Sequence, residues 1–391
     1  MFLPPLGYSS NLHAAETVDE LVGTLQRFTS EVRHRLGWER LGLDLRLGST
    51  AIRSLANDAT ARSTLRRALD DAHISAHSLN AFPLRPFQAA VVKADAYRPD
   101  WTEAERVDDT IAIIDVALAL CDDDFITVST VPGSYRPFGA QANNQQIIAA
   151  ALGRWAGHAA LRARTSARRV VLSLEPEPWC TLETSFDVVA FWRGPLADAG
   201  VRAAALLLDG DEKAARTAID THLGICFDTC HFSLAFEDQR AAVQRLRDAR
   251  VPIVKCQFSA APEVLRPFDD TAGLAALRAL AEPRFMHQTA ASSANGSLSK
   301  VQDLDQLDKC LARLPNATAV RSHFHIPIFR PAQPNGLSST IDDSRKGLDA
   351  CLEAGCTHVS VETYTWSILA EHERDALAGT VRELECLRKF V

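Results

Sequence analysis

The stretch Gly224-Ile-Cys-Phe-Asp-Thr-Cys-His231 decides the fold, because it has the pattern of a short apolar strand that ends in an acid. Alternate residues of a strand share a face, so Cys226 and Asp228 point one way and Phe227 the other. The small, acidic face fits the interior of a parallel barrel, and the apolar face fits a covering helix. A carboxylate with a nearby imidazole, here His231, is what metal-dependent barrels place at the carboxyl end of a strand. The structural alternative is that Asp228 caps the next helix and His231 lies on the surface.

The alternation of strand and helix patterns continues through most of the 391 residues. Between the strand patterns lie segments with apolar residues at helical spacing, and a loop rich in proline and aromatic residues (83–101) is expected over a barrel mouth. The other early strand patterns cover 7–11, 41–47, 74–82, 125–131, 169–175 and 251–257. Repeated strand–helix units of this kind predict an α/β fold, and at this length a closed (β/α)8 TIM barrel. The rival is a doubly wound open sheet, but no Gly-x-Gly-x-x-Gly turn follows an early strand, which disfavours dinucleotide binding.

The strand count becomes ambiguous after residue 257. Segments 284–288, 319–326 and 357–362 all have strand patterns and compete for the eighth place in the barrel. We therefore expect a single TIM-barrel domain over residues 1–391, with an insertion of about residues 260–335 before the last strand.

The composition of the chain limits which binding partners and which cellular compartment are expected. The formal net charge is -7 and no block rich in Lys and Arg is present, so a nucleic-acid partner, which needs a basic surface, is not expected. The nine cysteines include several inside apolar strand patterns, which is typical of a reducing compartment. The N-terminal residues lack the pattern of a secretory signal, and no apolar run is long enough to span a bilayer. A cytoplasmic protein without membrane insertion is predicted.

Residues able to bind a metal or transfer a proton recur at the predicted carboxyl ends of the strands. They are Glu175, Glu177, Asp228, His231, Lys255, Gln257, His287, His323, His325 and Glu362. In a barrel all of these ends open on one face, so the side chains should converge on one pocket. Several buried carboxylates side by side would each cost several kcal/mol unless a cation lies between them. The sequence therefore predicts a divalent metal site.

Some of these residues also have a structural interpretation. Lys255 could form a buried ion pair with Glu175 instead of binding substrate, and Glu177, between two prolines, could merely flank the site. His287 has the weaker strand context, whereas His323 and His325 are two apart and share one face of a predicted strand.

At these positions the chain resembles the xylose-isomerase-like TIM-barrel superfamily of sugar isomerases, sugar epimerases and endonuclease IV. It resembles more closely the EboE "metabolite traffic" family of ebo gene clusters. The matching segments are Asn11-Leu-His13, Asn80-Ala-Phe-Pro83, Leu174-Glu-Pro-Glu-Pro178, Phe227-Asp-Thr-Cys-His231, Lys255-Cys-Gln257, Met286-His-Gln288, His323-Phe-His-Ile-Pro327 and Val361-Glu-Thr-Tyr-Thr-Trp366. The resemblance implies that Glu175, Asp228 and Glu362 are metal ligands and that His231 faces the substrate or a second metal.

The remaining ligand could be Gln257, His287 or His325, because the insertion separates Gln257 from Glu362. A glutamine oxygen is a better ligand for Mg²⁺ or Mn²⁺ than for Zn²⁺. For all the predicted ligands together, Zn²⁺ and Fe are further candidate metals. We predict that His325 rather than His287 joins the ligands, with Gln257 beside it. The predicted metal set is thus Glu175, Asp228, Gln257, His325 and Glu362, and the predicted substrate-binding set is His13, His231, Lys255, His287 and His323.

The function predicted from these features is a metal-dependent isomerase or epimerase for a sugar or cyclitol, in the handling of a secondary-metabolite precursor. The metal would hold two vicinal oxygens of this polyol and stabilise an enediolate, while Glu175 and Glu362 move the proton. One alternative is a non-catalytic carrier that keeps the metal pocket to bind a metabolite. Another is a phosphodiesterase like endonuclease IV, which the acidic charge disfavours.

Overall fold

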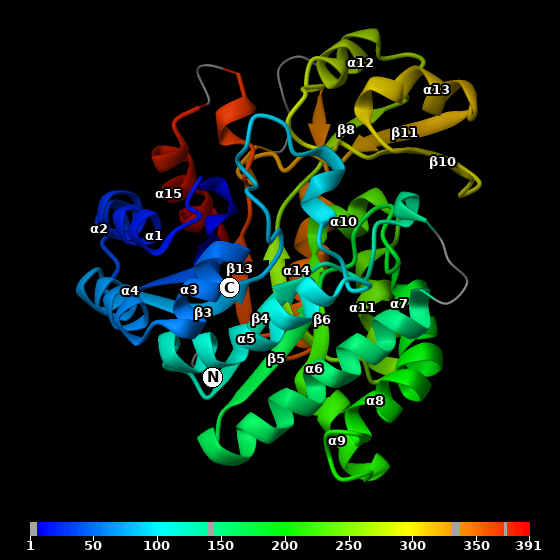
Figure 1. Cartoon of the computed structure of the whole chain (residues 1–391). Coiled ribbons are helices and arrows are strands. Elements are labelled where there is room, and N and C mark those ends of the chain that lie inside the picture. Colours follow the sequence, from blue (N-terminus) through cyan, green and yellow to red (C-terminus); the bar gives the residue numbers. More distant parts are fainter. Residues whose placement is uncertain (1–5, 140–143, 331–336, 371–373) are drawn as a thin grey trace.

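The computed structural model describes residues 6–139, 144–330, 337–370 and 374–391, and its centre is a closed barrel of eight parallel strands (Figure 1). Around the barrel the strands follow the order β1-β13-β7-β6-β5-β4-β3-β2. The strands are β1 Gly7–Ser9, β2 Leu41–Arg46, β3 Ile74–Asn80, β4 Phe125–Thr130, β5 Arg169–Leu174, β6 Leu223–Asp228, β7 Ile253–Phe258 and β13 His358–Val361. The predicted α/β fold, a (β/α)8 TIM barrel, is confirmed.

Strand β6 shows why the sequence pattern predicts the barrel. Cys226 points inward, where its Sγ lies 2.9 Å from Oε1 of Gln257 on β7. Phe227 points outward into the apolar layer and stacks on Phe232 of the following helix, with ring centroids 3.9 Å apart. All six residues of the strand are buried, as expected for a parallel strand that is covered on both faces.

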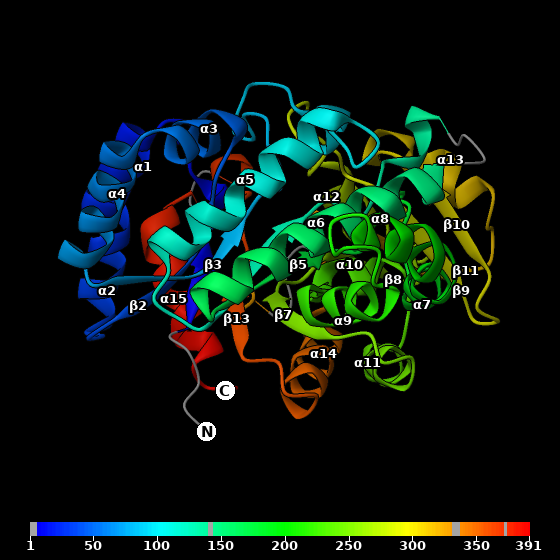
Figure 2. The ribbon, with the colours of Figure 1, turned by 60° about the horizontal axis from the view of Figure 1, so that its bottom comes forward.

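Helices cover the outside of the barrel (Figure 2). They are α1 Val18–Thr24, α2 Ser30–Leu36, α3 Ser49–Asn57, α4 Ala59–Asp71, α5 Ala104–Leu120, α6 Asn144–Ser166, α7 Ser185–Phe191, α8 Val201–Ala205, α9 Glu212–His222, α10 Thr229–Leu234, α11 Gln239–Asp248, α14 Ile341–Glu353 and α15 Ala376–Leu387. The π-helical turns η2 Leu25–Thr29 and η5 Trp192–Gly200 join neighbouring helices, and the 3-10 turns are η1 Ser10–Leu12, η3 Lys93–Tyr97, η4 Arg136–Phe138, η6 Leu304–Gln306 and η7 Trp366–Ile368.

The eighth strand of the barrel is β13, which corresponds to the predicted segment 357–362. It pairs in parallel with β7 on one side and with β1 on the other. The other two candidate segments lie within the insertion and do not join the barrel. Segment 284–288 forms no strand, and segment 319–326 contributes only its first part, to β11 (Ala317–Ser322), which pairs antiparallel with inserted strands. Apolar alternation predicts a strand but cannot tell which sheet the strand joins.

The insertion between β7 and α14 folds as an antiparallel sheet of five strands in the order β10-β9-β11-β8-β12. Its strands are β8 Pro262–Leu265, β9 Thr289–Ser293, β10 Leu298–Val301, β11 and β12 Ser338–Ser339, and its helices are α12 Thr271–Arg278 and α13 Leu307–Ala312. These elements have an apolar cluster of their own that includes Val264, Leu277 and Val320. Part of the expected range, residues 331–335, lies outside the described residues.

The inserted sheet stands beyond the carboxyl ends of the barrel strands (Figure 1). The loop after β3 reaches it, since the backbone N–H groups of Val92 and Lys93 both donate to the carbonyl of Arg284, at 2.7 and 2.8 Å. The loop and the insertion therefore enclose the barrel mouth together.

Within the described residues, no helix is long and apolar enough to cross a membrane.

Candidate metal centre

Three acidic residues from three barrel strands meet at the carboxyl-terminal face. Glu175 follows β5, Asp228 ends β6 and Glu362 follows β13, and one carboxylate oxygen of each lies within 4.8 Å of the others. All three side chains are buried. This convergence is the one expected when residues at the ends of different strands of one barrel face the same pocket.

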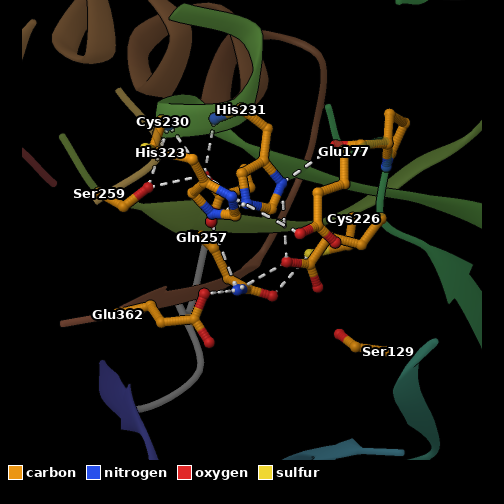
Figure 3. A network of polar contacts seen from close by, with 12 residues as sticks. Ser129, Glu177, Cys226, Cys230, His231, Gln257, Ser259, His323 and Glu362 are labelled. Carbon is orange, nitrogen blue, oxygen red and sulfur yellow. Dashed lines mark hydrogen bonds and ion pairs between the residues drawn. The ribbon is translucent and has the colours of Figure 1, made fainter. Parts of the chain in front are cut away.

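The amide of Gln257, on β7, lies among the three acids. Its Nε2 is 3.2 Å from Oε1 of Glu175 and 3.4 Å from Oδ2 of Asp228, and it also contacts Oε2 of Glu362. Figure 3 shows the Gln257 side chain extended toward Glu362. An amide carries no charge, and in the described part of the chain no Lys or Arg forms an ion pair with any of the three carboxylates. The charge of Lys255 acts on Glu175 and Glu362 from within the barrel, but no direct ion pair with a basic side chain of the described residues balances their negative charge.

The electrostatics of the acids reflect this imbalance. Burial, together with the nearby charges of Glu362 and Asp228, raises the pKa of Glu175 well above its ordinary value. Burial also raises the pKa of Glu362, to about 7. Burial opposes ionisation of Asp228 as well, but His231 and His325 hold the pKa of Asp228 below its ordinary value. A divalent cation would favour the ionised form of all three acids.

Asp228 has two roles at once. Its Oδ1 accepts hydrogen bonds from the backbone N–H groups of Cys230 (2.8 Å) and His231 (3.1 Å) and from the hydroxyl of Ser259 (2.7 Å), so it caps α10. Its Oδ2 faces Gln257 and the other acids. The helix cap of the structural interpretation is therefore formed, although His231 is buried and not on the surface, and Oδ2 is left facing the other acids.

The side chain of Glu362 is held in place by two residues at the end of β1 and within the chain's first 3-10 turn. Its Oε1 accepts from the hydroxyl of Ser9 (3.0 Å) and from Nδ2 of Asn11 (2.8 Å). Sequence reasoning selected His13 from this segment instead. His13 lies away from the acids, where Tyr8 Oη is 3.1 Å from its Nε2 and Phe28 packs on its ring. Asn11 ends the strand pattern 7–11, and that position was the signal that could have identified it.

His325 and His287 differ in what their ring nitrogens contact. Nδ1 of His325 donates to the carbonyl of Glu362 at 2.8 Å, and its buried Nε2 has no partner among the described residues. A ring held through Nδ1 with a free Nε2 is the usual state of a metal-binding histidine. His287 uses both nitrogens, with the carbonyl of His323 and with Glu282 as partners at 2.8 Å each. His287 supports the backbone of His323 and is not among the residues that line the pocket, where a substrate contact was expected of it.

Lys255 lies in the barrel interior and not at the pocket. Its Nζ is 2.6 Å from Oδ2 of Asp44 and 2.7 Å from Oγ of Ser129, and all three side chains are buried. Burial opposes the charge of Lys255, but the carboxylate of Asp44 raises its pKa above the ordinary value. Lys255 is not among the residues that line the pocket, and it does not form the alternative ion pair with Glu175, because Asp44 binds the ammonium group.

The remaining predicted residues face the pocket. The polar lining includes the predicted Glu175, Glu177, His231, His323 and Glu362, together with Asn11, Lys93 and Tyr97, which were not predicted, and the apolar wall includes Phe82, Phe87, Val92, Phe285, Met286 and Tyr364. Within this wall the rings of Phe87, Phe285 and Tyr364 lie 4.9 to 5.0 Å apart, centroid to centroid. Phe87 belongs to the loop after β3 and Phe285 to the insertion, so both peripheral segments shape the pocket.

The residues fit a divalent cation. Glu175 Oε2 and His325 Nε2 are buried and lack a hydrogen-bond partner in the described ranges, so they offer free lone pairs. Three carboxylates with an amide oxygen suit Mg²⁺ or Mn²⁺, and an added imidazole suits Zn²⁺ or Fe. The orientation of the Gln257 amide is an assignment, and a flip would turn its oxygen toward the ion.

No protein-family model matches the chain, and no curated protein matches it in sequence. Solved structures do. A xylose isomerase-like TIM barrel protein from Mycobacterium smegmatis, in complex with magnesium, is 12% identical with a TM-score of 0.52, over 100% of this chain and 98% of that one. A candidate sugar phosphate isomerase/epimerase from Anabaena variabilis is 12% identical with a TM-score of 0.51, also over 100% and 98%. The chain therefore has the xylose-isomerase-like TIM-barrel fold.

Proposed function

We propose that the protein is a divalent-metal-dependent isomerase or epimerase that acts on a sugar or cyclitol. One observation carries the proposal: Glu175, Asp228 and Glu362 are buried around a single point without a basic partner among the described residues, and two of them line a pocket. The solved structures of the same fold named above include a magnesium complex and a candidate sugar phosphate isomerase/epimerase, which supports this class.

Glu175, Asp228 and Glu362 would hold the ion, and His325 and Gln257 stand close enough to complete its ligands. A bound divalent ion supplies Lewis-acid polarisation of a substrate carbonyl and hydroxyl. Asn11 and Ser9 fix one oxygen of Glu362, so its other oxygen is oriented toward the Gln257 amide. Asp228 is committed to the cap of α10 through Oδ1 and would serve as a ligand only.

The two glutamates would transfer the proton. Both contact the Gln257 amide nitrogen and both line the pocket, so a substrate bound there lies against both carboxylates. One carboxylate takes the proton from the carbon beside the carbonyl. The other returns a proton to the opposite face of that carbon in an epimerase, or to the neighbouring carbon in an isomerase.

The apolar wall and the free cysteines refine the proposal. The resemblance to the EboE family, which rests on the sequence segments alone, favours a secondary-metabolite precursor as the polyol, and the aromatic rings of the pocket wall would cover an apolar part of it. All nine cysteines are free, which supports action in a reducing cytoplasm. The acidic net charge favours a small polyol over a nucleic acid as partner.

Exchange of substrate hydrogen with solvent tests this function. Metal-loaded protein is incubated in D2O with a panel of ketoses, aldoses and keto-cyclitols, and deuterium at the carbon beside the carbonyl is followed by NMR. We expect metal-dependent exchange that is lost in Glu175→Gln and Glu362→Gln. Glu383→Gln is the matched control, since Glu383 is also a buried acid with a pKa of about 7, raised by burial, but lies outside the pocket.

Binding of a polyol without exchange would instead identify a non-catalytic carrier. Exchange that persists in both glutamine variants would contradict the assigned proton transfer.

A further inference from the structure

The lining of the pocket has two chemically different parts. On its polar side, Oδ1 of Asn11 and Oε2 of Glu177 are buried and have no hydrogen-bond partner among the described residues. These two oxygens can accept hydrogen bonds from the hydroxyl groups of a polyol. Among the six side chains named for the apolar wall, only that of Tyr364 carries a strong hydrogen-bonding group.

Three aromatic rings form the centre of this wall, and each comes from a different segment of the chain. Phe87 lies in the loop after β3, Phe285 in the insertion and Tyr364 in the segment after β13. The rings pack on one another with centroids 4.9 to 5.0 Å apart and still line the pocket. A group that lies against them is removed from water, which is favourable for an apolar group and costly for a hydroxyl without a partner.

The polar groups next to the wall are already hydrogen-bonded within the protein. The backbone N–H groups of Val92 and Lys93 both donate to the carbonyl of Arg284. The hydroxyl of Tyr97 donates to Oε1 of Glu177 at 2.7 Å. A sugar or cyclitol without a substituent has a hydroxyl on nearly every carbon, and the hydroxyls that face the wall would lack partners.

The charges around the pocket disfavour an anionic substituent such as phosphate. Within the described residues, Lys93 is the only lysine or arginine that lines the pocket. Its Nζ is 2.5 Å from Oδ2 of Asp303, so its charge is already paired. The imidazoles of His231 and His323 contact each other, Nε2 to Nε2 at 3.1 Å, and Nδ1 of His323 is 3.6 Å from Oε1 of Glu177. A phosphate in the pocket would therefore meet carboxylates without a free basic partner.

We propose that the substrate is an uncharged polyol with an apolar substituent, either an aromatic ring or an alkyl chain, and that Phe87, Phe285 and Tyr364 bind this substituent. The hydroxyl groups of the polyol would lie on the polar side of the pocket, with two oxygens at the metal centre. Sugar phosphates would be excluded by the missing basic partner. The inference rests on the proposed function, because it takes the three acids as the place where the polyol oxygens bind.

Hydroxamates test this preference without turnover, because a hydroxamate offers two neighbouring oxygens to a divalent ion. The three matched probes are propionohydroxamate and its derivatives with a phenyl or a phosphono group on the far carbon. Binding of each probe to the Mn²⁺-loaded full chain is measured by calorimetry. We expect the phenyl probe to bind roughly 10-fold or more tightly than propionohydroxamate, as burial of one aromatic ring allows. The phosphono probe should bind more weakly than both.

Variants of the wall locate the preference. Phe285→Ala and Phe87→Ala should each lower the affinity for the phenyl probe by roughly 10-fold and change the affinity for propionohydroxamate much less. Retained binding of propionohydroxamate shows that these variants are folded and hold the metal. Phe186→Ala is the matched control, because it removes an exposed phenyl ring of α7 that does not line the pocket, and it should preserve the ranking of the probes.

Equal affinities for the phenyl probe and propionohydroxamate, or tightest binding of the phosphono probe, would overturn the proposal. Absence of binding by all three probes would overturn it as well, because the wall would then not lie beside a site for two oxygens. Failure of the deuterium exchange with the ranking preserved would contradict the proposed isomerase and leave the ligand preference standing. The two proposals can therefore fail separately.

Discussion

Two buried polar groups in the same barrel differ in how their charge is balanced. Inside the barrel, Lys255 binds Asp44 and Ser129 at 2.6 and 2.7 Å, so an acid faces a base. At the carboxyl-terminal face, Glu175, Asp228 and Glu362 meet around the neutral amide of Gln257 instead. The first group is electrostatically complete within the chain, and the second becomes complete only with a cation. This difference is the basis on which we propose a cation at the second group and not at the first.

The largest expected effect is loss of metal from an Asp228 variant. Asp228→Asn keeps a side-chain oxygen that can cap α10 but removes the charge, so metal binding should be lost with little change in melting temperature. Asp228→Ala should lose the metal and in addition about 1 kcal/mol of stability from the missing cap. Metal content and thermal unfolding of both variants are measured together. Full metal occupancy in Asp228→Asn would remove Asp228 from the ligands.

Loss of the Lys255–Asp44 ion pair in the barrel interior should have the opposite effect: it should lower stability and leave metal binding intact. Lys255→Met leaves the carboxylate of Asp44 buried without its partner, and we expect a loss of about 3–5 kcal/mol in the free energy of unfolding. The folded fraction should still bind metal, because Lys255 does not reach the acids of the pocket. Urea unfolding of Lys255→Met and of the double variant with Asp44→Asn is the measurement. The double variant should recover part of the loss, and no recovery would show that the two residues act independently.

A smaller effect is expected from the histidines. His325→Ala should lower metal affinity by roughly 100-fold, more than the loss of a supporting residue would, since its buried Nε2 has no partner among the described residues and a ring nitrogen of His325 lies within 4.8 Å of Asp228. His287→Ala should change metal affinity much less, because both of its nitrogens are already bound. Calorimetric titration of both variants decides between them. The reverse ranking would assign the ligand to His287.

The last expected effect is gradual and concerns the pH dependence of stability. In metal-free protein the pKa of Glu362 is about 7, against an ordinary value of 4.5. Between these values the folded state holds a proton that the unfolded state has released, so stability falls as pH rises, by at most about 1.4 kcal/mol per pH unit. Bound metal should remove this loss. Melting temperatures of metal-free and metal-loaded protein should therefore diverge from about pH 5 to about pH 8. Parallel curves would indicate that no ion binds Glu362.

The sequence predicted the barrel and its acids because both depend on short-range pattern. Glu175, Asp228 and Glu362 each end an apolar alternation, and parallel strands bring such ends together. Which side chains form ion pairs across a long stretch of sequence was not predictable in the same way. Asp44 is visible as an acid inside a strand, but nothing local identifies Lys255, 211 residues away, as its partner.

The sheet that the strands of the insertion form was the other feature that the sequence did not predict. The strand pattern that leads to His325 is real, but its hydrogen-bond partners are antiparallel strands of a second sheet. Which nitrogen of His325 or His287 is free depends on carbonyl groups of distant segments, and no spacing of residues specifies that.

The central claim is that the three acids hold a divalent ion, and anomalous X-ray scattering tests it most directly. Crystals of protein purified without a chelator, measured at the absorption edges of Mn, Fe and Zn, locate and identify each ion. The account predicts an anomalous peak bounded by Glu175, Asp228 and Glu362. In crystals grown with these metals present, the absence of such a peak, with the Gln257 amide still bonded to all three carboxylates, would contradict it.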